Sequence, residues 1–450
     1  MNITVDFNRV LGKIKPLNGF NNTARQTGYG ELLPAFQALN PSFVRLHDTC
    51  GKYGGAHYVD IPNVFPDFTA DPDDPASYDF FLTDRYIEKI VECGAQIIYR
   101  FGVTIEHEPV KYHIFAPKDP EKWASVCEHI VRHYNCGWAN GYYWNIRYWE
   151  IWNEPDGTAP DVEPFGPPNW IGTAEAYYHL YSVTANLIKS LHPDVMIGGY
   201  SSCYILGKFH QGKWEVGDTS YFTGFLDYIT APETKAPLDF FTWHGYLGKG
   251  NIDKITAESD FVDKTLNKYG FTDVLRIDAE WNCMICDIET QDYRTQYYIN
   301  LRNEKGASHT AGALYLMQRR RVDAAMYYDA QLWCEYGGLF HVPSLKPSKA
   351  YYAFYQFEQL RQLKNWCYSS ESAGIYTCAA SGEYDLLCAA NIGDAPEEIN
   401  FTIMNTKGKL AELFLTNAEH DYESVLLCEA KEFRRFTLPP YSFIGVKLYS

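Results

Sequence analysis

The feature that most constrains the fold is a repeated alternation of apolar, strand-like runs with helix-like segments. Runs rich in Val, Ile, Phe and Tyr recur eight times along the chain. Alternation repeated this often favours a closed parallel barrel over an open sheet. We therefore predict an α/β fold, a (β/α)8 TIM barrel, with strands at residues 16–22, 42–48, 95–102, 146–154, 195–202, 239–246, 274–282 and 324–331.

Helical patterns fill several of the intervals between these strands. Some begin at residues that suit a helix start, such as Asp119 before Pro120, and Thr173 before Glu175. The predicted helices cover residues 80–93, 120–134, 173–191, 253–268 and 292–319.

The pattern changes after about Leu360 to short runs separated by turn signals. This pattern of short runs and turns predicts a small all-β domain, a C-terminal β-sandwich. The opening residues Ile3 to Phe7 alternate with period two, and we expect them to join that domain as an extra strand. The predicted division is a barrel at 14–358 and an accessory β-sandwich of 1–13 plus 359–450.

Charge and hydropathy exclude several classes of partner. The formal net charge is −17, so most of the surface should repel nucleic acid. No run of 18 apolar residues occurs, and the first residues lack the basic start and apolar stretch of a secretory signal. We expect a cytoplasmic protein with no membrane partner, and the residues leave open whether it forms a homo-oligomer.

The 12 cysteines show no disulfide framework and are best interpreted as buried free thiols. Cys283 and Cys286 have C-x-x-C spacing, but no second pair of similar spacing lies nearby. A zinc site is therefore disfavoured, and we predict no metal and no cofactor.

Two glutamates stand at the ends of predicted strands. Glu154 closes the fourth strand in the sequence YWEIWNEP at 148–155, and Glu280 lies in RIDAEWN at 276–282, at the end of the seventh. The carboxyl ends of barrel strands are where barrel enzymes build their active sites. Because these two strands face each other across a barrel, we expect both carboxylates to contact one ligand.

A pair of carboxyls suits the cleavage of a glycosidic bond. The leaving oxygen needs a proton, while the anomeric carbon needs a nucleophile or a water on its other side. In retaining enzymes two carboxyls about 5 Å apart divide this work through a covalent glycosyl-enzyme. Each negative charge also keeps its neighbour protonated, since two close carboxylates resist ionising together.

Three further polar residues are expected around the carboxylates. His244 and Tyr246 end the sixth strand, beside the strand of Glu280. Tyr246 is predicted to donate a hydrogen bond that lowers the pKa of Glu280, and His244 to contact the sugar or Glu154. Asn153, directly before Glu154, suits a hydrogen bond to the 2-hydroxyl of a sugar.

Residues of the second strand complete the predicted site. Arg45 is expected to brace the carboxylates, and His47 is expected to bind a hydroxyl. Asp48 is expected to lie at the same carboxyl-terminal end of the barrel strands. Trp281 and Trp333 are candidates for stacking against sugar faces.

These motifs resemble a known group of proteins. The sequences WNEP at 152–155, AEWN at 279–282 and WHGY at 243–246 look like signatures of the large clan of retaining barrel glycoside hydrolases. Within that clan, VRLHD at 44–48 and the trailing β-domain resemble glycoside hydrolase family 39, which contains β-xylosidases and α-L-iduronidases. The resemblance implies net retention, no cofactor, Glu154 as acid/base and Glu280 as nucleophile.

The sugar is less constrained than the reaction. The resemblance implies an exo-acting, β-xylosidase-like hydrolase of small saccharides or glycosides. Ala279 stands where the xylosidase branch usually has a hydroxyl residue, and Cys283 and Met284 follow where small polar residues are common. A β-galactosidase or an α-L-arabinopyranosidase therefore remains an alternative.

Two other classes of protein fit these residues less well. An isomerase or aldolase on the same barrel would need a Schiff-base lysine, a metal cluster or a phosphate loop, and none stands out. A non-catalytic carbohydrate-binding protein would be expected to lose one of the two glutamates, and both are present.

Overall fold

The structure is a computed structural model. It describes residues 1–23, 33–49, 57–104, 112–157, 169–203, 205–206, 209–210, 213–214, 219–287, 290–332, 336–342 and 344–449.

Eight parallel strands of the described chain close into a barrel, as the sequence predicted. The hydrogen-bonded order around the barrel is β10-β11-β2-β3-β4-β5-β6-β9. Each strand lies within one of the eight predicted ranges: β2 (Gly19–Asn21), β3 (Phe43–Leu46), β4 (Gln96–Phe101), β5 (Tyr148–Ile151), β6 (Met196–Ser202), β9 (Phe240–Tyr246), β10 (Leu275–Asn282) and β11 (Ala324–Tyr327).

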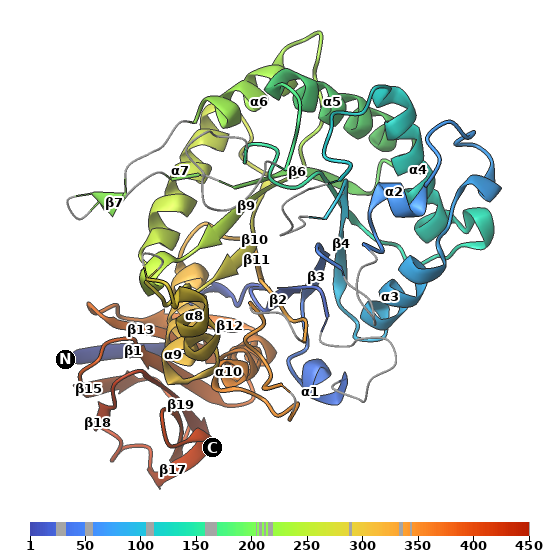
Figure 1. The fold of residues 1–450 in the computed structure, drawn as a ribbon. Coiled ribbons are helices and arrows are strands. Elements are labelled where there is room, and N and C mark those ends of the chain that lie inside the picture. The colour runs from blue at the N-terminus through green and yellow to red at the C-terminus, as the bar shows by residue number, and fades with distance from the viewer. Residues whose placement is uncertain are drawn as a thin grey trace.

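Helices surround this barrel (Figure 1). Asp119 and Thr173 cap two of them, since their side chains accept the N–H groups of Lys122 and Ala176. The helices are α1 (Leu33–Ala38), α2 (Ile61–Val64), α3 (Phe81–Val91), α4 (Pro120–Cys136), α5 (Ala174–Leu191), α6 (Ser220–Thr230), α7 (Lys254–Lys268), α8 (Tyr293–Arg302), α9 (Glu304–Arg319) and α10 (Lys349–Leu363). A short ribbon, β7 (Phe209–His210) and β8 (Lys213–Trp214), lies between β6 and α6.

The long helix predicted at 292–319 is instead two helices, α8 and α9. Asn303 separates them with extended backbone angles, φ −96° and ψ −170°, and its side chain accepts the N–H of Lys305. An Asn that bonds to nearby backbone N–H groups ends one helix and caps the next. The sequence prediction also missed α6 and α10.

The remaining strands form one mixed, nine-stranded sheet within the described chain, in the order β17-β16-β19-β14-β13-β12-β1-β15-β18. Its core contains Leu413 of β16 and Leu438 of β18, which stand near opposite ends of that order, so the sheet curls around the core. The strands are β1 (Asn2–Lys13), β12 (Asn365–Ser369), β13 (Ile375–Ser381), β14 (Asp385–Asn391), β15 (Glu397–Met404), β16 (Leu410–Thr416), β17 (Asp421–Glu429), β18 (Arg435–Leu438) and β19 (Ser442–Tyr449).

Strand β1 joins this sheet, as its period-two alternation predicted. It pairs antiparallel with β12 and parallel with β15, and Figure 1 shows the N-terminus among the orange and red C-terminal strands. The predicted division after residue 358 falls inside α10, whose Phe357 and Leu360 share a core with Cys378 and Leu386 of the sheet. The domain boundaries stay a prediction.

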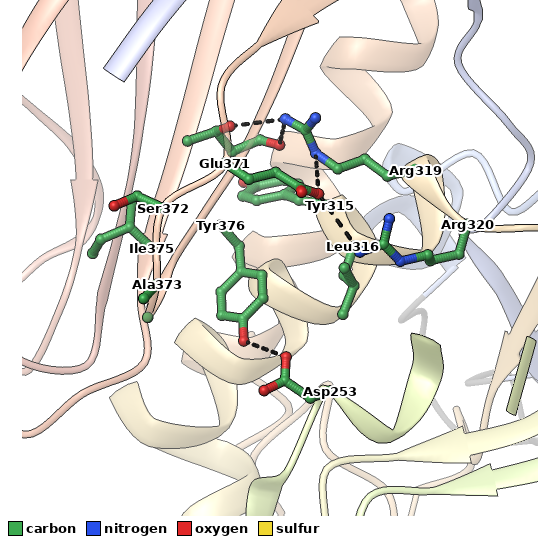
Figure 2. Close-up of a pocket in the computed structure, with 12 residues that line it drawn as sticks. Asp253, Tyr315, Leu316, Arg319, Arg320, Glu371, Ser372, Ala373, Ile375 and Tyr376 are labelled. Atoms are coloured by element: carbon green, nitrogen blue, oxygen red, sulfur yellow. Dashed lines mark hydrogen bonds and ion pairs between the residues drawn. The ribbon is translucent and has the colours of Figure 1, made fainter. Parts of the chain in front are cut away.

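The junction of barrel and sheet holds a pocket of about 300 Å³ (Figure 2). It lies between the end of α9 and the turn that joins β12 to β13. Glu371 of that turn lies 3.6 Å from Arg319 and 3.8 Å from Arg320, and Tyr376 donates to Asp253. These polar contacts tie the sheet to the barrel, away from the two glutamates.

Three large clusters of apolar side chains form the core of the described chain. One packs between strands and helices, a second inside the curled sheet, and a third inside the barrel, where Phe43, Ile98, Tyr148 and Phe240 meet. None of the helices in the described ranges combines the length and apolar character needed to cross a membrane.

We predict that replacing Ile3 by Ala destabilises the protein by about 2–5 kcal/mol, because Ile3 is fully buried in the core of the sheet. Urea unfolding would measure the loss. Asn8→Ala is the matched control, since Asn8 lies exposed on the same strand. Equal unfolding midpoints for the two variants would contradict a structural role for β1.

Candidate active site

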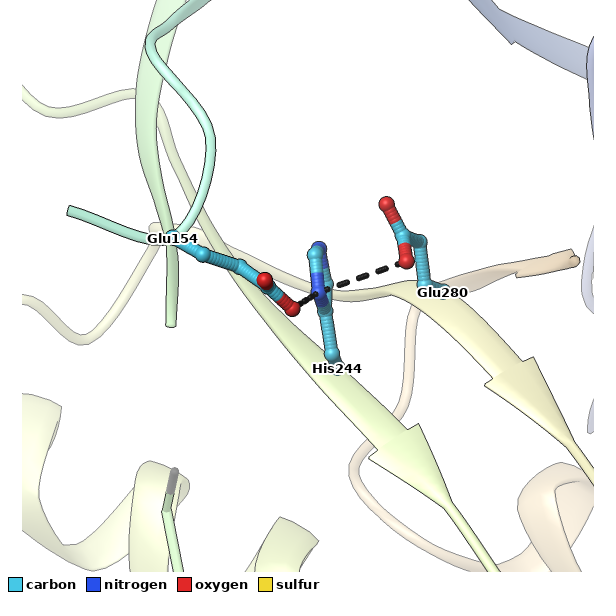
Figure 3. Close-up of side chains that lie close together, drawn as sticks. All are labelled: Glu154, His244 and Glu280. Carbon is cyan, nitrogen blue, oxygen red and sulfur yellow. Dashed lines mark hydrogen bonds and ion pairs between the residues drawn. The ribbon is translucent and has the colours of Figure 1, made fainter. Parts of the chain in front are cut away.

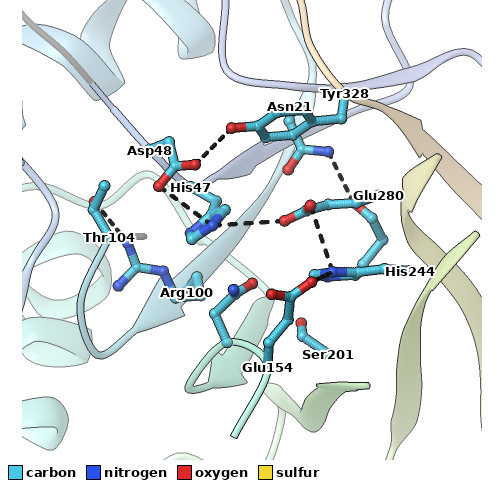
Figure 4. A network of polar contacts seen from close by, with 12 residues as sticks. Asn21, His47, Asp48, Arg100, Thr104, Glu154, Ser201, His244, Glu280 and Tyr328 are labelled. Atoms are coloured by element: carbon cyan, nitrogen blue, oxygen red, sulfur yellow. Dashed lines mark hydrogen bonds and ion pairs between the residues drawn. The ribbon is translucent and has the colours of Figure 1, made fainter. Parts of the chain in front are cut away.

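Glu154 stands just after β5, where the backbone leaves the extended conformation. β5 ends at Ile151, and Trp152 and Glu154 have positive φ angles of 71° and 48°. Residues other than glycine hold such angles only when surrounding contacts fix them. The N–H of Glu154 donates to the carbonyl of Ser201 on β6 at 3.1 Å. This bond helps to fix the turn from which the Glu154 side chain reaches toward His244 and Glu280 (Figure 4).

Glu280 is placed by an irregularity in β10. The register of β10 against β9 shifts between Asp278 and Glu280. Ala279 belongs to the core inside the barrel, while Trp281 packs in the core outside it. A bulge inserts an extra residue and re-aims a side chain. Ala279 and Glu280 therefore both face the interior, and Glu280 reaches the mouth.

Two donors hold the Glu280 carboxylate. Arg45 Nη1 donates to Oε1 at 2.7 Å, and the Tyr246 hydroxyl donates to Oε2 at 2.8 Å. Burial raises the pKa of Glu280 from its ordinary value, whereas His244 and Arg45 act to lower it and Glu154 adds to the rise. Burial raises the pKa of Tyr246 well above its usual value, and the negative charge of Glu280 raises it further. The Tyr246 hydroxyl therefore stays protonated and can donate a hydrogen bond.

The Glu154 carboxylate has different neighbours. Its Oε1 lies 2.5 Å from His244 Nδ1, and its Oε2 accepts from Asn169 Nδ2 at 2.8 Å. The same His244 nitrogen lies 3.4 Å from Glu280 Oε2, so the ring stands between the two carboxylates (Figure 3). His244 is thus the shared neighbour of both glutamates.

His244 is uncharged at neutral pH. Burial lowers the pKa of its imidazole to about 4, although Glu280 acts in the opposite direction. In one tautomer of a neutral imidazole Nδ1 accepts a hydrogen bond from a protonated carboxyl, and in the other tautomer it donates a hydrogen bond to a carboxylate. The contact with Glu154 therefore suits either protonation state of that carboxyl.

The two carboxylates are close enough to act on one bond. Oxygens of Glu154 and Glu280 and the Nδ1 of His244 lie within 4.8 Å of one another. Paired carboxyls about 5–5.5 Å apart are typical of retaining glycosidases, whereas inverting enzymes leave about 6.5–9.5 Å for a water. With their oxygens within 4.8 Å, the two carboxylates can contact one bond of a ligand.

Arg45 binds several strands together beneath these carboxylates. It is fully buried, and its Nε lies 2.6 Å from Glu150 Oε2 while its Nη2 donates to Asn153 and Ser201 at 2.7 and 2.9 Å. Burial alone would lower the pKa of Arg45, but Glu150 and Glu280 outweigh it and raise the pKa. The guanidinium therefore carries a permanent positive charge at the centre of the site.

His47 and Asp48 lie beside Glu280. His47 Nε2 is 3.4 Å from Asp48 Oδ1 and 3.6 Å from Glu280 Oε1. Asp48 Oδ2 accepts from the Tyr328 hydroxyl at 2.5 Å, and its side chain is 13% exposed, against none for His47. Asp48 is therefore the more accessible of the two to a ligand.

One predicted contact needs correction, and one falls outside the described residues. Trp281 was expected to stack on a sugar, but it is fully buried against Tyr327 and Phe354, because its side chain faces away from the barrel interior. Trp333 lies outside the described residues. Asn153 is buried beside Arg45, and its Nδ2 has no hydrogen-bond partner within the described chain.

The C-x-x-C pair does not form a metal site in the described part of the chain. The one group there that could hold an ion is Glu154, His244 and Glu280. Cys283 is fully buried, and burial raises the pKa of its thiol to about 12. Cys286 packs with Tyr297 and Leu301.

Sequence reasoning missed several residues of the network. Glu150, Asn169, Ser201 and Asn21 all contact Arg45 or Glu154. A signal existed only for Glu150, since a charged residue inside an apolar strand needs a buried partner, and Arg45 sits in a similar strand. The other three are ordinary polar residues that only the fold brings to the site.

An eight-stranded parallel barrel with paired carboxylates at its mouth is the architecture of the barrel-type glycoside hydrolases. The family model "Glycosyl hydrolases family 39" matches residues 1–277, more than half of the 450 residues. The chain therefore belongs to glycosyl hydrolases family 39. That match includes Glu154 and ends just before Glu280.

The curated relatives are longer than this chain, and each matches only part of it at low identity. The chain is 26% identical over 182 residues to a β-xylosidase of Geobacillus stearothermophilus, a match covering 38% of this chain and 31% of that one. It is 24% identical over 262 residues to a β-xylosidase of Caldicellulosiruptor saccharolyticus, covering 55% and 46%. The matched region thus spans less than half of each relative.

Solved structures share the fold over the whole chain. A glucosidase of Croceicoccus marinus has a TM-score of 0.76 at 19% identity, covering 100% of this chain and 98% of its own. A β-xylosidase of family 39 from Caulobacter crescentus has a TM-score of 0.67 at 13% identity, covering 100% of both.

We predict that Arg45→Met destabilises the protein by about 3–5 kcal/mol near pH 7, because it leaves Glu150 and Glu280 buried without their counter-charge. In the folded variant the buried Glu280 carboxyl, without Arg45, would hold its proton more tightly than it does in the unfolded chain. Its stability is then retained at low pH and lost as pH rises. Urea unfolding at about pH 5 and about pH 7 would measure the change.

Arg85→Met is the control for this measurement. Arg85 is 60% exposed and lies 3.9 Å from Glu88, a surface pair worth about 0–1 kcal/mol. A loss in Arg45→Met no larger than in Arg85→Met would show that the buried network contributes little.

Proposed function

We propose that this protein is a retaining glycosidase that works by double displacement, with Glu280 as nucleophile and Glu154 as acid/base. One observation carries the proposal: the two carboxyls approach within 4.8 Å but stand in different environments. Glu280 accepts from Arg45 and Tyr246, which favour its ionised form. Glu154 is paired with a neutral histidine and an amide, which tolerate a protonated carboxyl.

In the first step, Glu280 attacks the anomeric carbon while Glu154 gives its proton to the leaving oxygen. The bond from the sugar to the leaving group breaks as the bond to Glu280 forms. The buried Nδ2 of Asn153 is available to the 2-hydroxyl of the sugar, an interaction that strengthens in the transition state.

In the second step, the covalent sugar has cancelled the negative charge of Glu280. Glu154, now ionised, takes a proton from water as the water attacks the same carbon. The bond to Glu280 breaks, and the sugar leaves with its original anomeric configuration. His244 Nδ1 lies 2.5 Å from Glu154 Oε1 and holds this carboxyl in place through both steps.

The substrate we propose is a small β-xyloside, cleaved from its end. Support comes from the two curated relatives, which are β-xylosidases. β-Galactosides and α-L-arabinopyranosides are the competing substrates, because Ala279 departs from the xylosidase pattern. The partly exposed carboxylate of Asp48 could accept from a hydroxyl of any of these sugars. The role in sugar binding of Asn153, His244, Tyr246, His47 and Asp48 is part of this proposal.

We predict that the protein hydrolyses one member of a panel of aryl β-xyloside, β-galactoside, β-glucoside and α-L-arabinopyranoside, and that Glu280→Ala abolishes turnover. Azide should rescue Glu280→Ala and give the inverted glycosyl azide, because it enters the space of the lost nucleophile. With Glu154→Ala azide should give the retained product, because it attacks the glycosyl-enzyme. Product anomers would be read by NMR.

Glu233→Ala, at an exposed position, is the control for that panel and should behave as the wild type. Undiminished turnover by Glu280→Ala would exclude the mechanism. Sugar binding without turnover by the wild type would favour a carbohydrate-binding protein.

We further predict that Tyr246→Phe lowers kcat/KM roughly 10- to 150-fold, since a hydrogen bond to a charged group contributes about 1.5–3 kcal/mol. Losing this donor raises the pKa of Glu280, so the acid limb of the pH profile should move to higher pH. Tyr178→Phe, which removes a hydroxyl bonded to the Tyr221 carbonyl on the barrel exterior, should leave the limb in place. An unmoved limb in both variants would refute the role of Tyr246.

A further inference from the structure

Asp156 stands two residues after Glu154 and bonds to the neighbouring strand. Its Oδ2 accepts from the Ser202 hydroxyl at 2.6 Å, and its Oδ1 accepts from the backbone N–H of Cys203 at 2.9 Å. Both donors lie at the end of β6. Neither the motifs nor the mechanism above uses this carboxylate.

We propose that Asp156 is a positioning residue for Glu154, which clamps the acid/base loop onto β6 and whose negative charge helps Glu154 to keep its proton. The inference rests on the proposed function, because it assigns a role relative to the acid/base.

The clamp follows from three successive contacts along β6. The N–H of Glu154 donates to the carbonyl of Ser201, and Asp156 then bonds to the next two residues. The N–H of Gly157 donates to the carbonyl of Glu154 at 3.1 Å and closes the turn. Because Glu154 holds a φ of 48°, these bonds maintain a conformation that the residue alone would disfavour. A small misplacement of an acid/base costs rate steeply.

The charge follows from what surrounds Asp156. Burial raises the pKa of its carboxyl to about 7, Glu154 adds to the rise, and the bonds from Cys203 and Ser202 oppose it. The other titratable side chains that interact with its charge in the described chain are the hydroxyls of Tyr177, Tyr178, Tyr200 and Tyr221, while Cys203 contacts it through the backbone N–H. Burial raises the pKa of each of these tyrosines, so they are uncharged near neutral pH. Glu154 is the one other carboxyl among these described neighbours.

The direction of the effect is fixed by like-charge repulsion. Asp156 becomes negative as pH rises through about 7, and a negative neighbour disfavours the ionised form of Glu154. The acid therefore holds its proton to higher pH than it would beside an uncharged side chain. This extends the basic limb of the rate profile.

Two variants separate the clamp from the charge. Asp156→Asn keeps an acceptor for Cys203 and an amide that can donate to the Ser202 hydroxyl, but removes the charge. Asp156→Ala removes both. Asp323→Asn is the matched control, since Asp323 accepts the backbone N–H of Arg276 at 2.9 Å near the start of β10, far from Glu154 along the barrel.

The experiment compares pH profiles on two substrates of one sugar, one with a good leaving group (2,4-dinitrophenol) and one with a poor one (an alkyl alcohol). For Asp156→Asn we expect a rate at the optimum within about threefold of wild type, and a basic limb lower by roughly half a pH unit or more. For Asp156→Ala we expect kcat/KM, which reports the first step, to fall at least about tenfold on the alkyl glycoside but under about threefold on the dinitrophenyl glycoside, whose leaving group needs little acid assistance.

The outcomes distinguish this inference from the proposed function. An unmoved basic limb in Asp156→Asn, together with equal losses on both substrates in Asp156→Ala, would overturn the inference alone. If Asp156→Ala does not fold, Ser202→Ala replaces it, because it removes one of the two anchoring bonds, and the same inequality between substrates is expected. Absence of hydrolysis by the wild type would overturn the proposed function and this inference with it.

Discussion

The buried guanidinium of Arg45 is the interaction on which the site depends. It joins β3 to β5, β6 and β10 through Glu150, Ser201 and Glu280, and all four side chains are buried. Two carboxylates and a cation can share such an interior only when each charge has a partner. Arg45 therefore fixes where Glu280 stands and allows a second glutamate to lie nearby.

The two glutamates differ because the fold gives them different neighbours. Glu280 lies at the bulge of β10 and accepts hydrogen bonds from the Arg45 guanidinium and the Tyr246 hydroxyl. Glu154 sits on a turn after β5, and its carboxylate oxygens contact the neutral ring of His244 and the amide of Asn169. Opposed environments of this kind let one carboxyl stay ionised while the other carries a proton.

Strand positions were predictable because each barrel strand is a short apolar run, and all eight predicted ranges contain a strand. The helix at 292–319 was predicted as one piece, because the capping bond of Asn303 is invisible to apolar periodicity. As an aromatic residue beside Glu280, Trp281 is a candidate for stacking on a sugar, but the structure buries it. The bulge at Ala279 and Glu280 decides instead which side chains face inward.

The sequence by itself determined the alternation that closes the barrel, the two glutamates at strand ends and the entry of Ile3–Phe7 into the C-terminal sheet, because these depend on local periodicity and residue type. Only the tertiary structure decided the spacing of the carboxylates, the partners of Arg45 and the contact of Asp156 with β6. Those features join residues tens to hundreds of positions apart. Their distances are set by barrel closure, a bulge and positive φ angles, which local pattern does not encode.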